Sequence, residues 1–173
     1  MRDAKPVTVL GIDPGTAVTG YGVVRKEGRN PLTLVECGVI RTKPRDDLSR
    51  RLAEIHDGVT ELIRRHQPSV LSIEDIFYAR NVRTTVVLGH ARGVILLAGE
   101  QAGLDIHEYP PAEIKKAVAG TGAATKLQIQ FMVTRLLRLK SAPQPSDAAD
   151  GVAAALAYAL MPDLPKLEPV RFA

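Results

Sequence analysis

An apolar run near the start of the chain leads directly into an acidic residue and a turn, so the fold must bury a strand and place a carboxylate at its end. Residues 7–12 read VTVLGI, and Asp13-Pro14-Gly15 follow them. A β-branched and aliphatic run closed by Pro-Gly is typical of a buried strand that ends at a sheet edge. A carboxylate there is costly unless positive charge meets it. Asp13 is therefore either a turn cap or part of a charged site.

The patterns that follow extend this strand into a sheet. Residues 19–25 and 32–40 have the composition of two further strands joined by a turn, which predicts an antiparallel meander. An apolar series with helical spacing comes next and ends before Pro68, and residues 69–73 then form a fourth strand that delivers Glu74. Three strands, a helix and a strand predict a mixed α/β sheet.

The second half of the chain combines helices with one more strand. Thr125 and Gln128 have the spacing of a capping box, and Ser146 is placed to cap the last helix. Residues 162–173 form a proline-rich tail without periodicity. The expected elements are a helix over residues 81–102, a strand over 104–109, a short helix opened by Pro110-Pro111, and helices from 125 to about 139 and from 147 to 160.

Length and composition indicate one domain over residues 1–173. With 45% hydrophobic and 24% charged residues, the chain has enough apolar side chains for a core without cross-links. The lone Cys37 rules out a disulfide framework within the chain and indicates a reducing compartment. No apolar run approaches the ~18 residues of a membrane span, so we expect a cytoplasmic location without a membrane. A net charge of +4 permits a polyanionic partner without requiring one.

Four acids fall where α/β folds place catalytic sites, at strand ends and a helix start. Asp13 and Glu74 end two apolar strands, and Asp147 and Asp150 lie three residues apart on one face of the last helix. If that helix packs beside the sheet, the four carboxylates lie close together and repel one another. Bound hard divalent cations usually neutralise such a group of carboxylates. Two such ions ~3.5–4 Å apart are the arrangement used for phosphodiester hydrolysis.

Each acid also has an ordinary structural explanation. Asp147 near a helix N-terminus gains from the helix dipole without any metal, and Glu74 could pair with Arg80 or Arg83. Asp150 is harder to explain in this way, because it interrupts an alanine-rich helix whose other residues are small and apolar.

An aromatic pair near these acids is a candidate for contact with nucleic acid. Phe77-Tyr78 follows Glu74 closely in a chain with few aromatic residues, and Arg80 and Arg83 flank the pair. An exposed ring can stack on an unpaired base, and neighbouring arginines can bind phosphate. The alternative is a phenylalanine that anchors the loop on the core.

Lysines near the expected helix starts are further candidates. Lys115, Lys116 and Lys126 could contact a DNA backbone, or they could be ordinary surface lysines. Lys126 follows a Gly-rich loop at the start of a helix, where it opposes the helix dipole but helps to form an anion site.

The helix expected over residues 81–102 is apolar around much of its circumference and contains Gly89, Ala91 and Gly93. Such a helix is buried on several sides, which favours one face on the sheet and another on a second subunit. The alternative is burial between the sheet and neighbouring elements of the same chain.

Five motifs, taken in order, resemble the RuvC family of bacterial Holliday-junction resolvases, within the ribonuclease H-like superfamily. The resemblance runs nearly from end to end. Each motif alone is weak, and their order makes the match specific. The motifs are GIDPG at residues 11–15 with TGYG at 19–22, SIEDIF at 72–77, LGHARGV at 88–94, ATK at 124–126 and DAAD at 147–150.

The resemblance implies a fold and an activity. The fold is a five-stranded mixed sheet, with strands 1–3 antiparallel and the later strands parallel, flanked by helices. The activity is that of a homodimeric endonuclease that nicks two opposing strands of a four-way DNA junction symmetrically and leaves 5′-phosphate ends. The cofactor is Mg²⁺, two ions per active site with Mn²⁺ as a substitute, and the implied partner is a branch-migration helicase motor in recombination and repair.

The same resemblance assigns roles to individual residues. It places all four acids in the metal site, with Asp13 as the bridging ligand, and it makes Phe77 the base-stacking aromatic. Lys115 and Lys126 match basic positions near the DNA backbone, and the helix with Gly89 and Gly93 matches the dimer interface. At Asp147 some family members have histidine. Asp75 adds an acid beside Glu74, and strand alternation should point it away from the site.

Three other functions remain open at this stage. The residues DPGT at 13–16 with TG at 19–20 also resemble the phosphate loop of sugar-kinase and actin-like proteins, although those need two related domains and about twice this length. The others are a ribonuclease H-like RNA-processing nuclease and a junction-binding module without activity.

Overall fold

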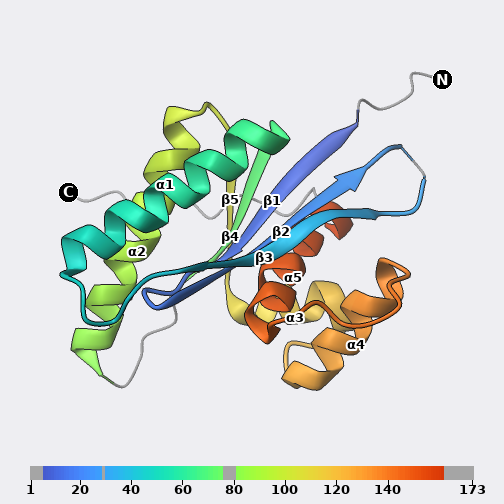
Figure 1. Cartoon of the computed structure of the whole chain (residues 1–173). Coiled ribbons are helices and arrows are strands. Elements are labelled where there is room, and N and C mark those ends of the chain that lie inside the picture. Colours follow the sequence, from blue (N-terminus) through green and yellow to red (C-terminus); the bar gives the residue numbers. More distant parts are fainter. Residues whose placement is uncertain (1–5, 29, 76–80, 162–173) are drawn as a thin grey trace, which may run out of the picture.

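The structure is a computed structural model and describes residues 6–28, 30–75 and 81–161. A mixed sheet forms its centre, with helices on both faces (Figure 1). In chain order the elements are β1 Val7–Asp13, β2 Val18–Lys26, β3 Thr33–Arg41, α1 Leu48–His66, β4 Val70–Glu74, α2 Val82–Gln101, β5 Asp105–Tyr109, α3 Pro111–Ala119, α4 Lys126–Leu136 and α5 Ser146–Leu160.

The sheet confirms the predicted mixed topology. Its strand order is β3-β2-β1-β4-β5, in which β1, β2 and β3 pair antiparallel while β4 runs parallel to both β1 and β5. Because Ile12 pairs with Ile73 across β1 and β4, the next residues, Asp13 and Glu74, leave the sheet at the same end. The two strand-end acids are therefore neighbours in space although 61 positions separate them in the sequence.

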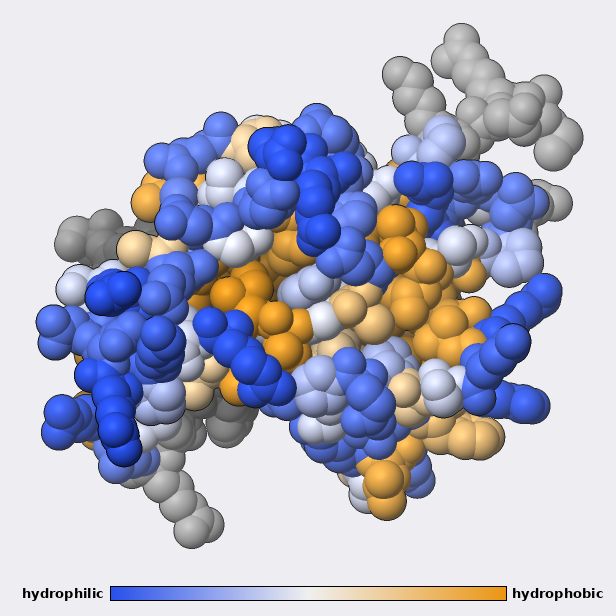
Figure 2. All heavy atoms as spheres, viewed as in Figure 1, coloured by the Kyte–Doolittle hydropathy of each residue, from blue (hydrophilic) through white to orange (hydrophobic). Residues whose placement is uncertain are grey.

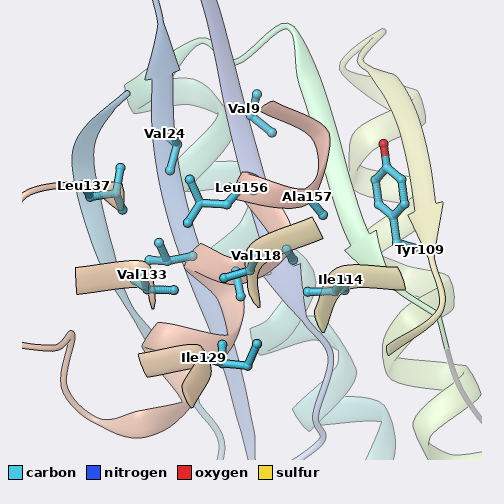
Figure 3. Close-up of a cluster of buried hydrophobic side chains, with 14 of the residues drawn as sticks. Val9, Val24, Tyr109, Ile114, Val118, Ile129, Val133, Leu137, Leu156 and Ala157 are labelled. Carbon is cyan, nitrogen blue, oxygen red and sulfur yellow. The ribbon is translucent and has the colours of Figure 1, made fainter. Parts of the chain in front are cut away.

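Strand alternation divides the core into two halves. On one face of the sheet, Leu10 of β1 and Leu71 of β4 pack against α1 and α2. On the other face, Val9 and Val24 pack against α5, which lies along β1 and β2 with α3 and α4 outside it. Figure 3 shows this second half, where side chains of the sheet, α3, α4 and α5 point toward one another. Since Asp13 follows Val9 by four residues, it lies on the α5 face.

The surface in the view of Figure 2 is hydrophilic over most of its area. Apolar side chains appear in a band across the middle of this face, where β3 forms the edge of the sheet. None of the helices in the described part of the chain has the length and apolar character that a membrane crossing requires.

Most predicted element boundaries agree with the structure, and two helix ends differ. The capping box is confirmed, since Thr125 Oγ1 accepts from Gln128 N at 3.3 Å and Gln128 Oε1 accepts from Thr125 N at 2.8 Å. The prediction that Ser146 caps the last helix is wrong. Ser146 is already the first helical residue, and Pro145, whose ring fixes a suitable φ, precedes it without a side-chain cap. Helix α4 ends at Leu136, three residues earlier than expected.

Candidate active site

Three acids from two distant parts of the chain meet beside the sheet. Asp13 at the end of β1 and Asp147 and Asp150 in the first two turns of α5 each offer a carboxylate oxygen, and these oxygens lie within 4.8 Å of one another. Carboxylate oxygens are the ligands that hard divalent cations prefer. The donor set of this cluster therefore fits a divalent metal ion.

Small residues let α5 approach the sheet closely enough to form this cluster. A Cβ on Gly20 of β2 would overlap the backbone of Asp147, and a Cβ on Gly151 would overlap the backbone of Tyr21. A further tie comes from Ser72 of β4, whose hydroxyl donates to the Ala154 carbonyl at 2.5 Å. Close helix–sheet packing thus places Asp147 and Asp150 next to the end of β1.

Glu74 lies in the same cavity, outside the tightest group of three. The cavity has a volume of about 270 Å³ and opens between the strand ends and helices α3, α4 and α5. Within the described part of the chain, acidic, basic and apolar side chains line it, and no Ser, Cys or His is among them. The lining residues are Asp13, Glu74, Pro111, Ile114, Lys115, Lys126, Ile129, Asp150 and Ala153.

The environment strongly disfavours negative charge on the two strand-end acids. Burial, followed by the charges of Glu74, Asp150 and Asp147, raises the pKa of Asp13 to about 8. Burial and the charge of Asp150 raise the pKa of Glu74 to about 7. Perturbed acids that share a cavity are typical of functional sites, because a stable core has no need for such repulsion.

Two lysines supply positive charge at the cavity. Lys126 Nζ lies 2.8 Å from Asp150 Oδ2, and Lys115 of α3 lines the same cavity. Lys116, next along α3, is exposed and is not among the lining residues. The structure thus brings Lys115 and Lys126 to the predicted acids and leaves Lys116 outside.

The other predicted DNA contacts lie away from this cavity or outside the described residues. Phe77, Tyr78 and Arg80 belong to residues 76–80, which the structure does not describe. Arg83 is exposed in the first turn of α2, and among the described residues no ion pair joins it to Glu74.

A charged cluster beside Glu74 was not predicted from the sequence. Arg92 of α2 reaches across to the carboxylates of Asp75 and Glu108, with 3.2 Å between its Nη2 and Asp75 Oδ1. Asp75 therefore points toward α2 rather than into the cavity, as strand alternation predicted. The signal for this cluster was an arginine at position 92 between small and apolar helix residues, which requires carboxylate partners if it is buried.

Helix α2 keeps an apolar surface exposed. Val86 is 53% exposed and Leu97 is 49% exposed, and a Cβ placed on Gly89 or Gly93 would meet nothing within 4 Å. A shallow depression of about 520 Å³ lies along this face. The sheet therefore covers only one side of this helix, through buried residues such as Ile95.

Comparison with known proteins gives one consistent result. Residues 9–158 match the family model described as crossover junction endodeoxyribonuclease RuvC. A protein of that name from Pelotomaculum thermopropionicum is 46% identical over 151 residues, which cover 87% of this chain and 92% of the relative. The RuvC structure from Thermus thermophilus is similar, with a TM-score of 0.83 at 36% identity over 90% of this chain and 95% of that one. A second structure of T. thermophilus RuvC, in complex with Holliday junction substrate, gives a TM-score of 0.82 at 34% identity over the same shares of both chains.

Proposed function

The chain belongs to the RuvC family of crossover junction endodeoxyribonucleases, and on that premise we propose that it resolves four-way DNA junctions by hydrolysing phosphodiester bonds at the cavity around Asp13. One observation supports this function above the others. Carboxylates of Asp13, Asp147 and Asp150 converge within 4.8 Å, and Glu74 lines the same cavity. Divalent cations are the ions that such a group of carboxylate oxygens suits best.

We propose Mg²⁺ as the cofactor, two ions per site, with Mn²⁺ as a substitute. The four acids would hold the ions, because their oxygens match the preference of hard cations. Asp13 is proposed as the shared ligand, since the charges of the other three acids all act on its carboxyl group. When bound, such ions polarise the scissile phosphate and favour ionisation of the attacking water.

The side chains of the cavity have separate tasks in this proposal. The acids bind and orient the cations, and Lys115 and Lys126 contact backbone phosphates next to the cleaved bond. We propose water as the nucleophile, in keeping with a described cavity lining that includes no Ser, Cys or His. Cleavage leaves a 5′-phosphate and a 3′-hydroxyl. Phe77 is proposed to stack on a base of the opened junction, with Arg80 and Arg83 on nearby phosphates.

We propose that two copies of the chain pair through helix α2. The support is the exposed apolar face of this helix, where Gly89 and Gly93 leave room for a close approach of a second helix. A two-fold dimer presents two equivalent sites to a four-way junction, which has two opposing strands to cut. A branch-migration helicase motor is the further partner that we propose on the basis of the family.

A cleavage assay tests the function directly. We expect a synthetic four-way DNA junction to be cut into paired nicked duplexes with Mg²⁺ and left intact with a chelator. Linear DNA duplex and structured RNA of equal length are the comparison substrates. Preferential cutting of RNA would favour a ribonuclease H-like RNA-processing enzyme, and binding of the junction without cleavage at any divalent ion would favour a binding module. Either outcome would contradict the proposal.

A further inference from the structure

The ammonium group of Lys126 lies at the edge of the carboxylate cluster, paired with Asp150. Lys126 Nζ is 2.8 Å from Asp150 Oδ2, and the lysine lines the cavity together with Asp13 and Glu74. Burial and neighbouring acids raise the pKa of both Asp13 and Glu74; at Glu74 the charges of Lys115 and then Lys126 oppose that rise, and at Asp13 the charge of Lys126 does so. The charge of this lysine therefore acts on the whole cluster and not only on Asp150.

The place of Lys126 in its helix points to the same conclusion. It is the first residue of α4, where a cation opposes the helix dipole and is unfavourable. The capping box of Thr125 and Gln128 fixes the start of the helix at this position. The ion pair with Asp150 compensates the unfavourable charge, so the position of this lysine is explained by the acids opposite and not by its own helix.

We propose that Lys126 is a built-in counter-ion of the carboxylate site, and that a divalent cation must displace it from Asp150 in order to bind. This inference rests on the metal-dependent function proposed above and deepens it. Both cations need the same carboxylate, so each weakens the binding of the other. A DNA phosphate offers the displaced ammonium a new partner, and the junction should therefore strengthen metal binding.

Three roles of Lys126 make different predictions for metal affinity. A lysine that only contacts DNA leaves the affinity of the free protein for metal unchanged. A lysine that holds Asp150 in its binding position makes affinity weaker when it is removed. A counter-ion that competes with metal makes affinity tighter when it is removed, and only the counter-ion proposed here has this sign.

The test measures Mg²⁺ binding to the protein without DNA, by titration calorimetry and by the rise of Tm with Mg²⁺ concentration. We expect Lys126→Gln to lower the Kd for Mg²⁺ by about three- to fivefold, the size typical of a partly exposed ion pair. Lys126→Met, which keeps the aliphatic stem, should do the same, and Lys126→Arg, which keeps the charge, should stay near wild type. Lys116→Gln is the matched control, because Lys116 is exposed and does not line the cavity.

The outcomes separate this inference from the function on which it rests. Unchanged or weaker Mg²⁺ affinity in both Lys126→Gln and Lys126→Met, with normal binding by wild type, would overturn the counter-ion role alone. A wild-type protein that binds no Mg²⁺ would overturn the metal-dependent function as well.

Discussion

Asp13 has the most strongly raised pKa among the described acids of the site. An aspartate carboxyl group usually ionises near pH 4, but burial and three neighbouring acids raise the pKa of Asp13 to about 8. A carboxyl group whose pKa is raised on folding stabilises the folded state fully at a pH below its pKa in the unfolded chain. That contribution is lost as the pH rises through its pKa in the folded protein. In the absence of metal, the site therefore destabilises the protein increasingly between pH 4 and pH 8.

Asp13→Asn removes this destabilising charge together with the proposed shared metal ligand. We expect the variant to lose junction cleavage while retaining junction binding, because the proposed DNA contacts are mostly basic residues and not the acids. With a chelator present, its Tm should exceed that of wild type by on the order of 5 °C at pH 8.5 and by little at pH 5. Thermal melts at the two pH values check the sign. Glu27→Gln, at an exposed side chain, is the control, for which we expect the same Tm difference from wild type at both pH values. Equal Tm differences at the two pH values for Asp13→Asn would contradict the argument.

At the scale of elements, the approach of α5 to the sheet decides whether the site exists. Gly20 has no room for a side chain, since a Cβ would overlap the Asp147 backbone, which cannot move aside as a flexible side chain could. We expect Gly20→Ala to lower the free energy of unfolding by about 1–3 kcal/mol. It should also weaken Mg²⁺ binding in the folded protein. Urea denaturation and calorimetry measure the two effects, and a variant with unchanged metal affinity would show that this packing does not position Asp147.

Helix α2 permits a second test at this scale. Val86→Glu combined with Leu97→Glu places two charges on its exposed apolar face, which we propose as the dimer contact. We expect this variant to be monomeric in sedimentation experiments at concentrations where wild type is dimeric. Leu127→Glu with Phe131→Glu changes two apolar residues on α4 that are even more exposed, and it should leave the dimer intact. If both double variants remain dimeric, α2 is not the interface.

The sequence alone was sufficient to predict the strands, because apolar runs closed by turns mark them and family motifs fixed their order. It was also sufficient to place Asp13, Glu74 and the acids of α5 at element ends. Local sequence patterns were a weaker guide where a neighbouring residue or a distant element determines the structure. Ser146 has the right composition for a cap, yet Pro145 lets the helix begin one residue earlier. The Arg92 cluster depends on partners from β4 and β5 that no local pattern links to α2.

At the scale of the whole molecule, the proposed dimer would cut a junction symmetrically with one active site from each protomer. Mixed dimers of wild type and Asp13→Asn, purified through two different affinity tags, should contain a single competent site. On a supercoiled plasmid that carries a cruciform, wild type should give linear product, and the mixed dimer should give nicked circles. Gel electrophoresis distinguishes the two products. Linear product from the mixed dimer in a single binding event would contradict the assignment of one nick to each site.

The acids of the cluster come from the first strand and the last described helix, so the order of synthesis affects when the site can exist. Proteins are made from the N-terminus, and β1 with Asp13 leaves the ribosome long before α5 with Asp147 and Asp150. A partly made chain that ends before α5 holds Asp13 but lacks the other two acids of the cluster. On the proposed mechanism, a chain that stops before α5 lacks Asp147 and Asp150, so we expect it to be inactive as a nuclease.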